Sequence, residues 1–168
     1  MNPLLIHPDL ELHVQLIRIL AILEKASLNR NDTLVLNIEK IAVFDFFLRH
    51  PVILFEVLKM ADKKIPFTLE EHERNSISSN YPSREGLYRF EEYRKLVQIL
   101  LIYGHLTVTV TDSKEPFYNI TERGKNFIDQ INTSYALRQR ELATAFAALH
   151  SQTYRNLLAQ ITPHINGK

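Results

Sequence analysis

The sequence contains no cysteine and no tryptophan, and it has only four glycines. Without cysteine, disulfides, thiol nucleophiles and zinc–thiolate sites are excluded, and a reducing cytoplasm is the expected location. Four glycines provide no Gly-rich phosphate loop, and no nucleophile elbow is present. We therefore expect a protein that binds other molecules, that is not an enzyme and that carries no cofactor.

Long apolar runs are also missing, so no segment is expected to span a bilayer. Residues 1–12 lack the basic start and the cleavage site of a secretory signal. The net charge of +1 indicates no particular class of partner, although residues 121–168 carry six Lys and Arg against three Asp and Glu. We accordingly expect neither a membrane nor a small-molecule substrate among the ligands.

The length and composition predict one domain with a single core. The chain has 168 residues, of which 45% are hydrophobic, and this is too short for two ordinary domains. We divide the domain, residues 1–168, into an N-terminal helix (1–33), a central body (34–121) and a C-terminal helical extension (122–168).

The hydrophobic periodicity predicts a mainly α fold with one small β-hairpin. Helices are expected at residues 8–27, from Asn37 as N-cap to about 50, at 52–61 after Pro51, and at 87–103 before Gly104. A short strand is expected at 34–36, a short helix with a Thr68 and Glu71 capping box lies in 63–87, and the hairpin covers 105–120.

Potential metal ligands are not arranged as a site. None of the seven histidines lies four residues from another with a flanking carboxylate, as a metalloprotease helix requires. Glu70, Glu71 and Glu73 form an acidic cluster on a short polar helix, and we expect these carboxylates to be solvated. We predict no bound metal.

The end of the hairpin carries a motif. Residues 118–125 read YNITERGK, in which Tyr118 and Ile120 would face the core, Thr121 would cap the next helix and Gly124 would allow close packing. This segment resembles the wing of winged helix-turn-helix domains. The resemblance implies a winged-helix body with helical extensions at both ends.

Winged helices include both DNA readers and protein-binding adaptors, and both uses stay open here. A DNA reader would present Arg84, Arg89, Arg94 and Lys95 to the major groove. However, Glu85, Glu91 and Glu92 are interleaved with these cations, and the wing tip at 112–115 has a net negative charge. The solvated face of an amphipathic helix explains the same residues.

After Thr121 the sequence predicts one long helix, or two helices with a kink near residues 132–134. Its apolar stripe has two interpretations, since it packs either on the first helix or on another chain. For the second, we name as partner-binding candidates Tyr135, Leu142, Phe146, Leu149 and Tyr154.

The Phe-rich segment 41–51, IAVFDFFLRHP, together with the wing motif, resembles the small middle component of bacterial three-component ABC-ATPase systems. That group includes Lamassu-type anti-phage systems. The resemblance implies a non-catalytic accessory subunit that bridges an SMC-like coiled-coil ATPase and an effector, often a nuclease, with DNA reached through the complex. The alternative is a dimeric winged-helix transcription regulator that uses the C-terminal stripe as its dimer seam.

Two details of the Phe-rich segment are predicted separately. We expect Phe46 and Phe47 to lie in the core, because a Phe-rich helix is usually buried. Asp45 and Arg49 stand four residues apart on the same helix, so an ion pair worth ~0.2–0.5 kcal/mol is expected.

Overall fold

The computed structural model describes residues 11–76 and 81–165. Within these ranges it contains eight α-helices, two 3-10 helices and one two-stranded antiparallel sheet, which confirms the predicted mainly α fold with a small β-hairpin. In chain order the elements are α1 (Leu12–Ala26), α2 (Ile38–Arg49), α3 (Pro51–Met60), α4 (Glu71–Asn75), η2 (Glu85–Tyr88), α6 (Phe90–Ile102), β1 (Leu106–Val110), β2 (Pro116–Ile120), α7 (Glu122–Asp129), α8 (Ser134–Ala143), η3 (Thr144–Ala148) and α9 (Tyr154–Ile165). None of the described helices is long and apolar enough to cross a bilayer.

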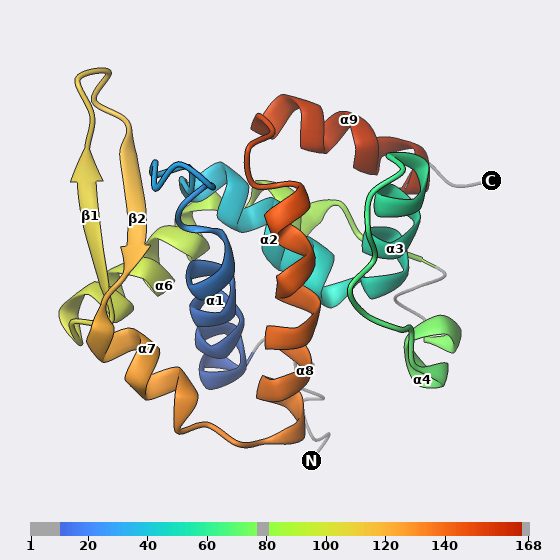
Figure 1. The fold of residues 1–168 in the computed structure, drawn as a ribbon, viewed down its shortest axis with the longest axis horizontal. Coiled ribbons are helices and arrows are strands. Elements are labelled where there is room, and N and C mark those ends of the chain that lie inside the picture. Colours follow the sequence, from blue (N-terminus) through green and yellow to red (C-terminus); the bar gives the residue numbers. More distant parts are fainter. Residues whose placement is uncertain (1–10, 77–80, 166–168) are drawn as a thin grey trace, which may run out of the picture.

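Helices α1 and α2 form the centre of the molecule. Helix α1 packs against α2, α6, α7 and α8, and Figure 1 shows it beside α8, with the hairpin and α7 on its other side. The largest fully buried side chains include Phe44, Phe46 and Phe47 of α2, so the predicted core position of Phe46 and Phe47 is confirmed. One hydrophobic cluster takes side chains from α1 through to α9.

Local sequence signals set the ends of α2 and α3. The Asn37 side chain accepts a hydrogen bond from the Lys40 backbone N–H at 3.0 Å, as expected for an N-cap. Pro51 occupies the first turn of α3, where its missing N–H costs nothing. The first helix begins at Leu12 in the structure, and the part of its predicted range at residues 8–10 lies outside the described residues.

The prediction for the short helix was right in kind but wrong in its cap. The N-terminus of helix α4 is capped by a capping box of Glu70 and Glu73, not of Thr68 and Glu71. The Glu73 carboxylate accepts the Glu70 backbone N–H at 2.9 Å. A glutamate can perform the role that the prediction assigned to threonine because its carboxylate also accepts a backbone N–H.

The hairpin lies between α6 and α7, as the motif predicted. Gly104 ends α6 with φ +74°, and Thr121 caps α7 by accepting the Gly124 N–H at 3.0 Å. A Cβ on Gly124 would stand 2.2 Å from the His105 carbonyl oxygen, so only glycine allows α7 to approach the sheet this closely. Tyr118 and Ile120 are buried, and the Tyr118 N–H donates to Leu36 O at 2.9 Å. The strand predicted at 34–36 does not form; Leu34 makes only an isolated bridge with Leu28.

The C-terminal part is more broken than predicted. The chain leaves the helical path after α7 and resumes it at Thr133, which caps α8, so the two-helix alternative is correct at this point. A second interruption separates η3 from α9. The apolar stripe folds back on the body, where the Phe146 ring stacks on Phe44 with centroids 4.3 Å apart.

Candidate functional site

An exposed apolar surface surrounds the C-terminal end of α6. Among the described residues, twelve large hydrophobic side chains are exposed, and six of them lie on the end of α6, on β1 or on α7. These six, which we call the docking surface, are Leu101, Ile102, Tyr103, Val108, Val110 and Phe127. Ile102 is 82% exposed and Val110 is 62% exposed. Exposed apolar side chains on neighbouring elements can form a surface that binds another protein.

The helical repeat explains why α6 exposes these residues. Tyr93, Leu96, Val97 and Leu100 take the buried face of α6, with the spacing of one helical stripe. Leu101 and Ile102 follow on the exposed side, where an amphipathic helix normally carries polar residues. Packing within the described chain therefore does not account for these two side chains.

Two hollows adjoin the docking surface. One, of about 290 Å³, lies between α1, α6 and α7 and has an almost entirely apolar lining that includes Leu16, Tyr103 and Phe127. The other, of about 160 Å³, lies between α6 and β1, and its lining includes Leu101, Val108 and Arg94. Such hollows beside exposed apolar groups can receive the anchoring side chains of a partner.

The cations predicted to contact DNA lie near the start of α6, but two of them are paired with neighbouring carboxylates. Arg89 contacts Glu85 at 2.5 Å and Glu92 at 3.5 Å, and the hydrogen bond that Arg89 donates to the Glu85 carboxylate raises the pKa of Arg89. Arg94 pairs with Glu91. Among the described residues, Arg84 and Lys95 make no ion pair. The interleaved glutamates leave residues 84–95 with a net charge of only +1, so this face is weakly suited to DNA.

The predicted partner-binding residues require a correction. Leu142, Phe146 and Leu149 have no exposed surface, so in this structure they form neither a partner contact nor a dimer seam. They are buried because α8, η3 and α9 fold onto α1 and α2. Tyr135 and Tyr154 are half-buried: the Tyr135 hydroxyl accepts Arg18 Nη1 at 3.2 Å, and the Tyr154 ring meets Phe90 edge-on.

A buried charge network connects the body to the C-terminal part, and the sequence analysis found only one of its links. Asp45 accepts hydrogen bonds from Arg18 Nε at 2.5 Å, from Arg49 Nε at 3.0 Å and from the Tyr93 hydroxyl at 2.9 Å. The predicted Asp45–Arg49 pair is therefore confirmed as one part of a larger arrangement. Through Arg18 and Tyr135 the network links α1, α2, α6 and α8.

The pKa values in this network follow from burial and charge. Burial alone would raise the pKa of Asp45, but the Arg18 and Arg49 guanidinium groups hold it below its ordinary value. Burial likewise opposes the charge on Arg18, yet Asp45 raises the pKa of Arg18. Burial and the neighbouring carboxylate raise the pKa of Tyr93. These groups stabilise one another, and their contacts define a structural network.

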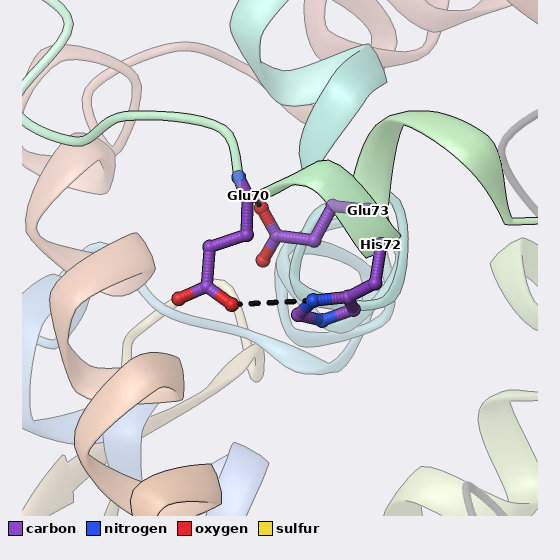
Figure 2. A group of neighbouring side chains, drawn as sticks. All are labelled: Glu70, His72 and Glu73. Carbon is purple, nitrogen blue, oxygen red and sulfur yellow. Dashed lines mark hydrogen bonds and ion pairs between the residues drawn. The ribbon is translucent and has the colours of Figure 1, made fainter.

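Glu70, His72 and Glu73 could together offer three ligand atoms to a metal ion, and Figure 2 shows them on α4 and the residue before it. However, Arg138 donates to both oxygens of Glu73, from Nε at 2.8 Å and from Nη2 at 2.6 Å. Glu73 is buried by this pairing, which corrects the prediction that it is solvated. A guanidinium in this position takes the place of a cation, so we assign the cluster to capping and ion pairing.

The fold and the docking surface together describe a small, mainly α protein that presents apolar groups to a partner. The chain matches the family described as ABC-three component (ABC-3C) system Middle Component 4 over residues 26–159. It belongs to this family, and the predicted middle component, an accessory subunit with partners in a three-component ABC system, is thereby confirmed. Comparison with curated proteins and with solved structures found no match.

Proposed function

We propose that this middle component is a non-catalytic adaptor, which joins the ATPase of its ABC system to an effector through the docking surface. The observation that carries the proposal is the group of exposed apolar residues around the end of α6. Family membership supplies the partners, and the exposed groups supply a place for one of them to bind.

The finer features of the system follow from the resemblance of the Phe-rich segment and the wing motif. We propose that the ATPase is an SMC-like coiled-coil protein, that the effector is a nuclease, and that the complex defends bacteria against phage in the cytoplasm. We also propose that α6, β1, β2 and α7 form a winged helix; support comes from the order of these elements and from the Tyr118 to Leu36 hydrogen bond. DNA would then be reached through the complex.

The charge pattern favours a protein partner over DNA. The docking surface ends a helix whose arginines, Arg89 and Arg94, are already paired with glutamates. The interleaved glutamates leave this face with little net positive charge for phosphate. Burial of Ile102 and Val110 gains free energy directly, at about 25 cal/mol per Å² of apolar surface. A regulator of transcription would also need a dimer seam other than the buried C-terminal stripe.

The test is affinity purification of the tagged chain expressed with its neighbouring genes, followed by mass spectrometry and a molar-mass measurement. Ile102→Asp places a charge on the docking surface, and Met60→Asp changes a similarly exposed residue of α3 as the matched control. We expect Ile102→Asp to weaken partner recovery by about tenfold or more, because a charge in an apolar contact costs ~2 kcal/mol or more, and Met60→Asp to leave it intact.

If both variants are folded, as judged by circular dichroism, and recover equal amounts of the partner, the docking surface does not bind the partner. Recovery of the chain alone as a homodimer that binds a specific DNA sequence would contradict the adaptor and favour the regulator.

A further inference from the structure

The hydrogen bonds at the two ends of the hairpin fix the direction of every backbone group in β1. The Thr121 N–H donates to His105 O at 3.0 Å, and the Thr111 N–H donates to Glu115 O at 3.1 Å. Hydrogen-bonded pairs alternate along an antiparallel ladder, so Thr107 and Thr109 form the paired positions between these ends. The N–H and C=O groups of Val108 and Val110 therefore point away from β2.

The opposite strand agrees with this assignment. Tyr118 stands across from Val108, and its N–H points away from β1 to reach Leu36 O at 2.9 Å. The outer side of β2 is thus partly covered by the chain around Leu36. Among the described residues, no segment pairs with the outer side of β1, since the sheet has two strands and β1 lies at its outer edge in Figure 1.

Strand β1 also lacks the features that protect free edges. Proteins commonly block an edge with proline, lysine or another charge. Residues 106–110 read LTVTV, without proline or charge and with a high preference for extended structure, whereas the proline of the hairpin is Pro116 on β2. Residues 107–110 are all exposed. This edge is open to pairing with another strand.

The surroundings of β1 indicate what kind of strand would fit. Val108 lines the hollow between α6 and β1 together with Leu101 and Arg94, so alternate side chains of an added strand would lie over this hollow. An apolar side chain of the added strand would pack against Leu101, and a carboxylate of that strand would pair with Arg94. The present partner of Arg94, Glu91, is 81% exposed, and a surface ion pair of this kind contributes only about 0–1 kcal/mol.

We propose that β1 receives an extended segment of another protein of the ABC system, with alternating apolar residues and a carboxylate, as the third strand of the sheet. This inference rests on the proposed adaptor function. It adds the mode of binding: the backbone of Val108 and Val110 supplies the hydrogen bonds, and the hollow beside Leu101 and Arg94 selects the side chains.

Amide hydrogen exchange resolved to single residues tests the proposal on the free chain and on the purified complex. In the free chain we expect Thr107 and Thr109 to be protected by β2, while Val108 and Val110 exchange freely. In the complex, the Val108 and Val110 amides should exchange at least tenfold more slowly. A bound partner with no new protection at these amides would overturn strand addition and leave the adaptor function standing.

Two substitutions of one residue provide the matched test. Val108→Pro removes an N–H that points outward, a position at which edge strands tolerate proline, and Val108→Thr keeps the N–H and the β-branched shape. We expect the proline variant to lose at least tenfold in partner affinity, and the threonine variant to stay within about twofold. Preserved protection of Thr107 and Thr109 shows that the hairpin is intact.

Equal affinities of the two variants would overturn the proposal. Protection of Val108 and Val110 that grows with the concentration of the chain alone would also overturn it, because the occupant would then be a second copy. Failure to recover any component would contradict the adaptor function and, with it, this inference.

Discussion

Replacing Asp45 by asparagine removes one negative charge from the centre of the molecule while almost preserving the shape of the side chain. Asp45 is 2% exposed and Arg18 is 2% exposed, so neither group has water as an alternative partner. In the variant, the Arg18 guanidinium keeps its charge but faces a neutral amide at the position where Asp45 Oδ1 lay at 2.5 Å. The buried guanidinium then loses the carboxylate of α2 with which it pairs.

We expect this change to lower the free energy of unfolding by ~3–5 kcal/mol, the usual cost of removing one partner from a buried ion pair. For a chain of this size, that loss corresponds to a fall in the melting temperature of roughly 6–20 °C. Asp45 has a depressed pKa in the folded chain, so its contribution is complete above the unfolded value of about 3.9 and is lost as the pH falls through the folded pKa. The deficit of the variant should therefore shrink in strong acid.

Urea unfolding followed by circular dichroism measures this difference, and Glu91→Gln provides the comparison. Glu91 also pairs with an arginine, but it is exposed, so its loss should cost less than about 1 kcal/mol. The double variant Arg18→Met, Asp45→Leu should recover only part of the stability, because apolar residues can replace the buried pair but remove the acceptor of Arg49 and of the Tyr93 hydroxyl. If Asp45→Asn costs no more than Glu91→Gln, the reasoning about a buried network is wrong.

Three further changes test other parts of the fold. Gly124→Ala should cost about 1–3 kcal/mol in thermal unfolding, since its Cβ would overlap the His105 carbonyl, and a neutral effect would contradict the close packing. Phe146→Ala should cost ~3–5 kcal/mol through the cavity beside Phe44, whereas a fully stable variant would show that the stripe is not core. Burial, together with the charges of Lys40 and Arg30, lowers the pKa of His150, so the folded chain loses stability as the pH falls below about 6.5. His150→Gln should flatten the dependence of the unfolding free energy on pH between pH 7 and 5, and an unchanged slope would refute this.

The hairpin and its flanking helices could be predicted from the sequence because their signals are local. Thr121 and Gly124 stand three residues apart, and the hydroxyl and amide that they bring together are neighbours along the chain. Gly104 likewise marks the end of α6 through its own positive φ. In such cases a residue type and its immediate neighbours determine the backbone geometry, so reading the sequence alone is sufficient.

The buried network could be predicted only in part, because most of its links join distant residues. Arg18 lies 27 positions from Asp45, and Tyr93 lies 48 positions away. One signal was available: a carboxylate within the Phe-rich segment is unstable in a core unless a cation joins it. That argument requires a partner for Asp45 beyond the helix surface, but it does not identify Arg18.

The sequence left two interpretations of the apolar stripe in the C-terminal part: packing on the first helix or contact with another chain. Only the three-dimensional surroundings of the stripe distinguish them. Periodicity shows which side chains share a face, but it does not show what covers that face. The cations of this region gave a similar ambiguity. Part of the positive charge of residues 121–168 is neutralised by ion pairs within the fold, since Arg138 binds Glu73 and Arg140 binds Glu24 and Asp129.

The distribution of polar and apolar groups gives the strongest physical argument for an adaptor. Two of the arginines that the sequence offered to DNA, Arg89 and Arg94, are paired on the surface, and Arg18 is paired in the core. Apolar side chains stand instead on the outside, at the end of α6 and on β1, where no described segment covers them. Folding of the described chain leaves these side chains in water at a cost in free energy. In the proposed adaptor, the assembled complex would remove that cost, so the proposal accounts for a surface that the isolated fold does not explain.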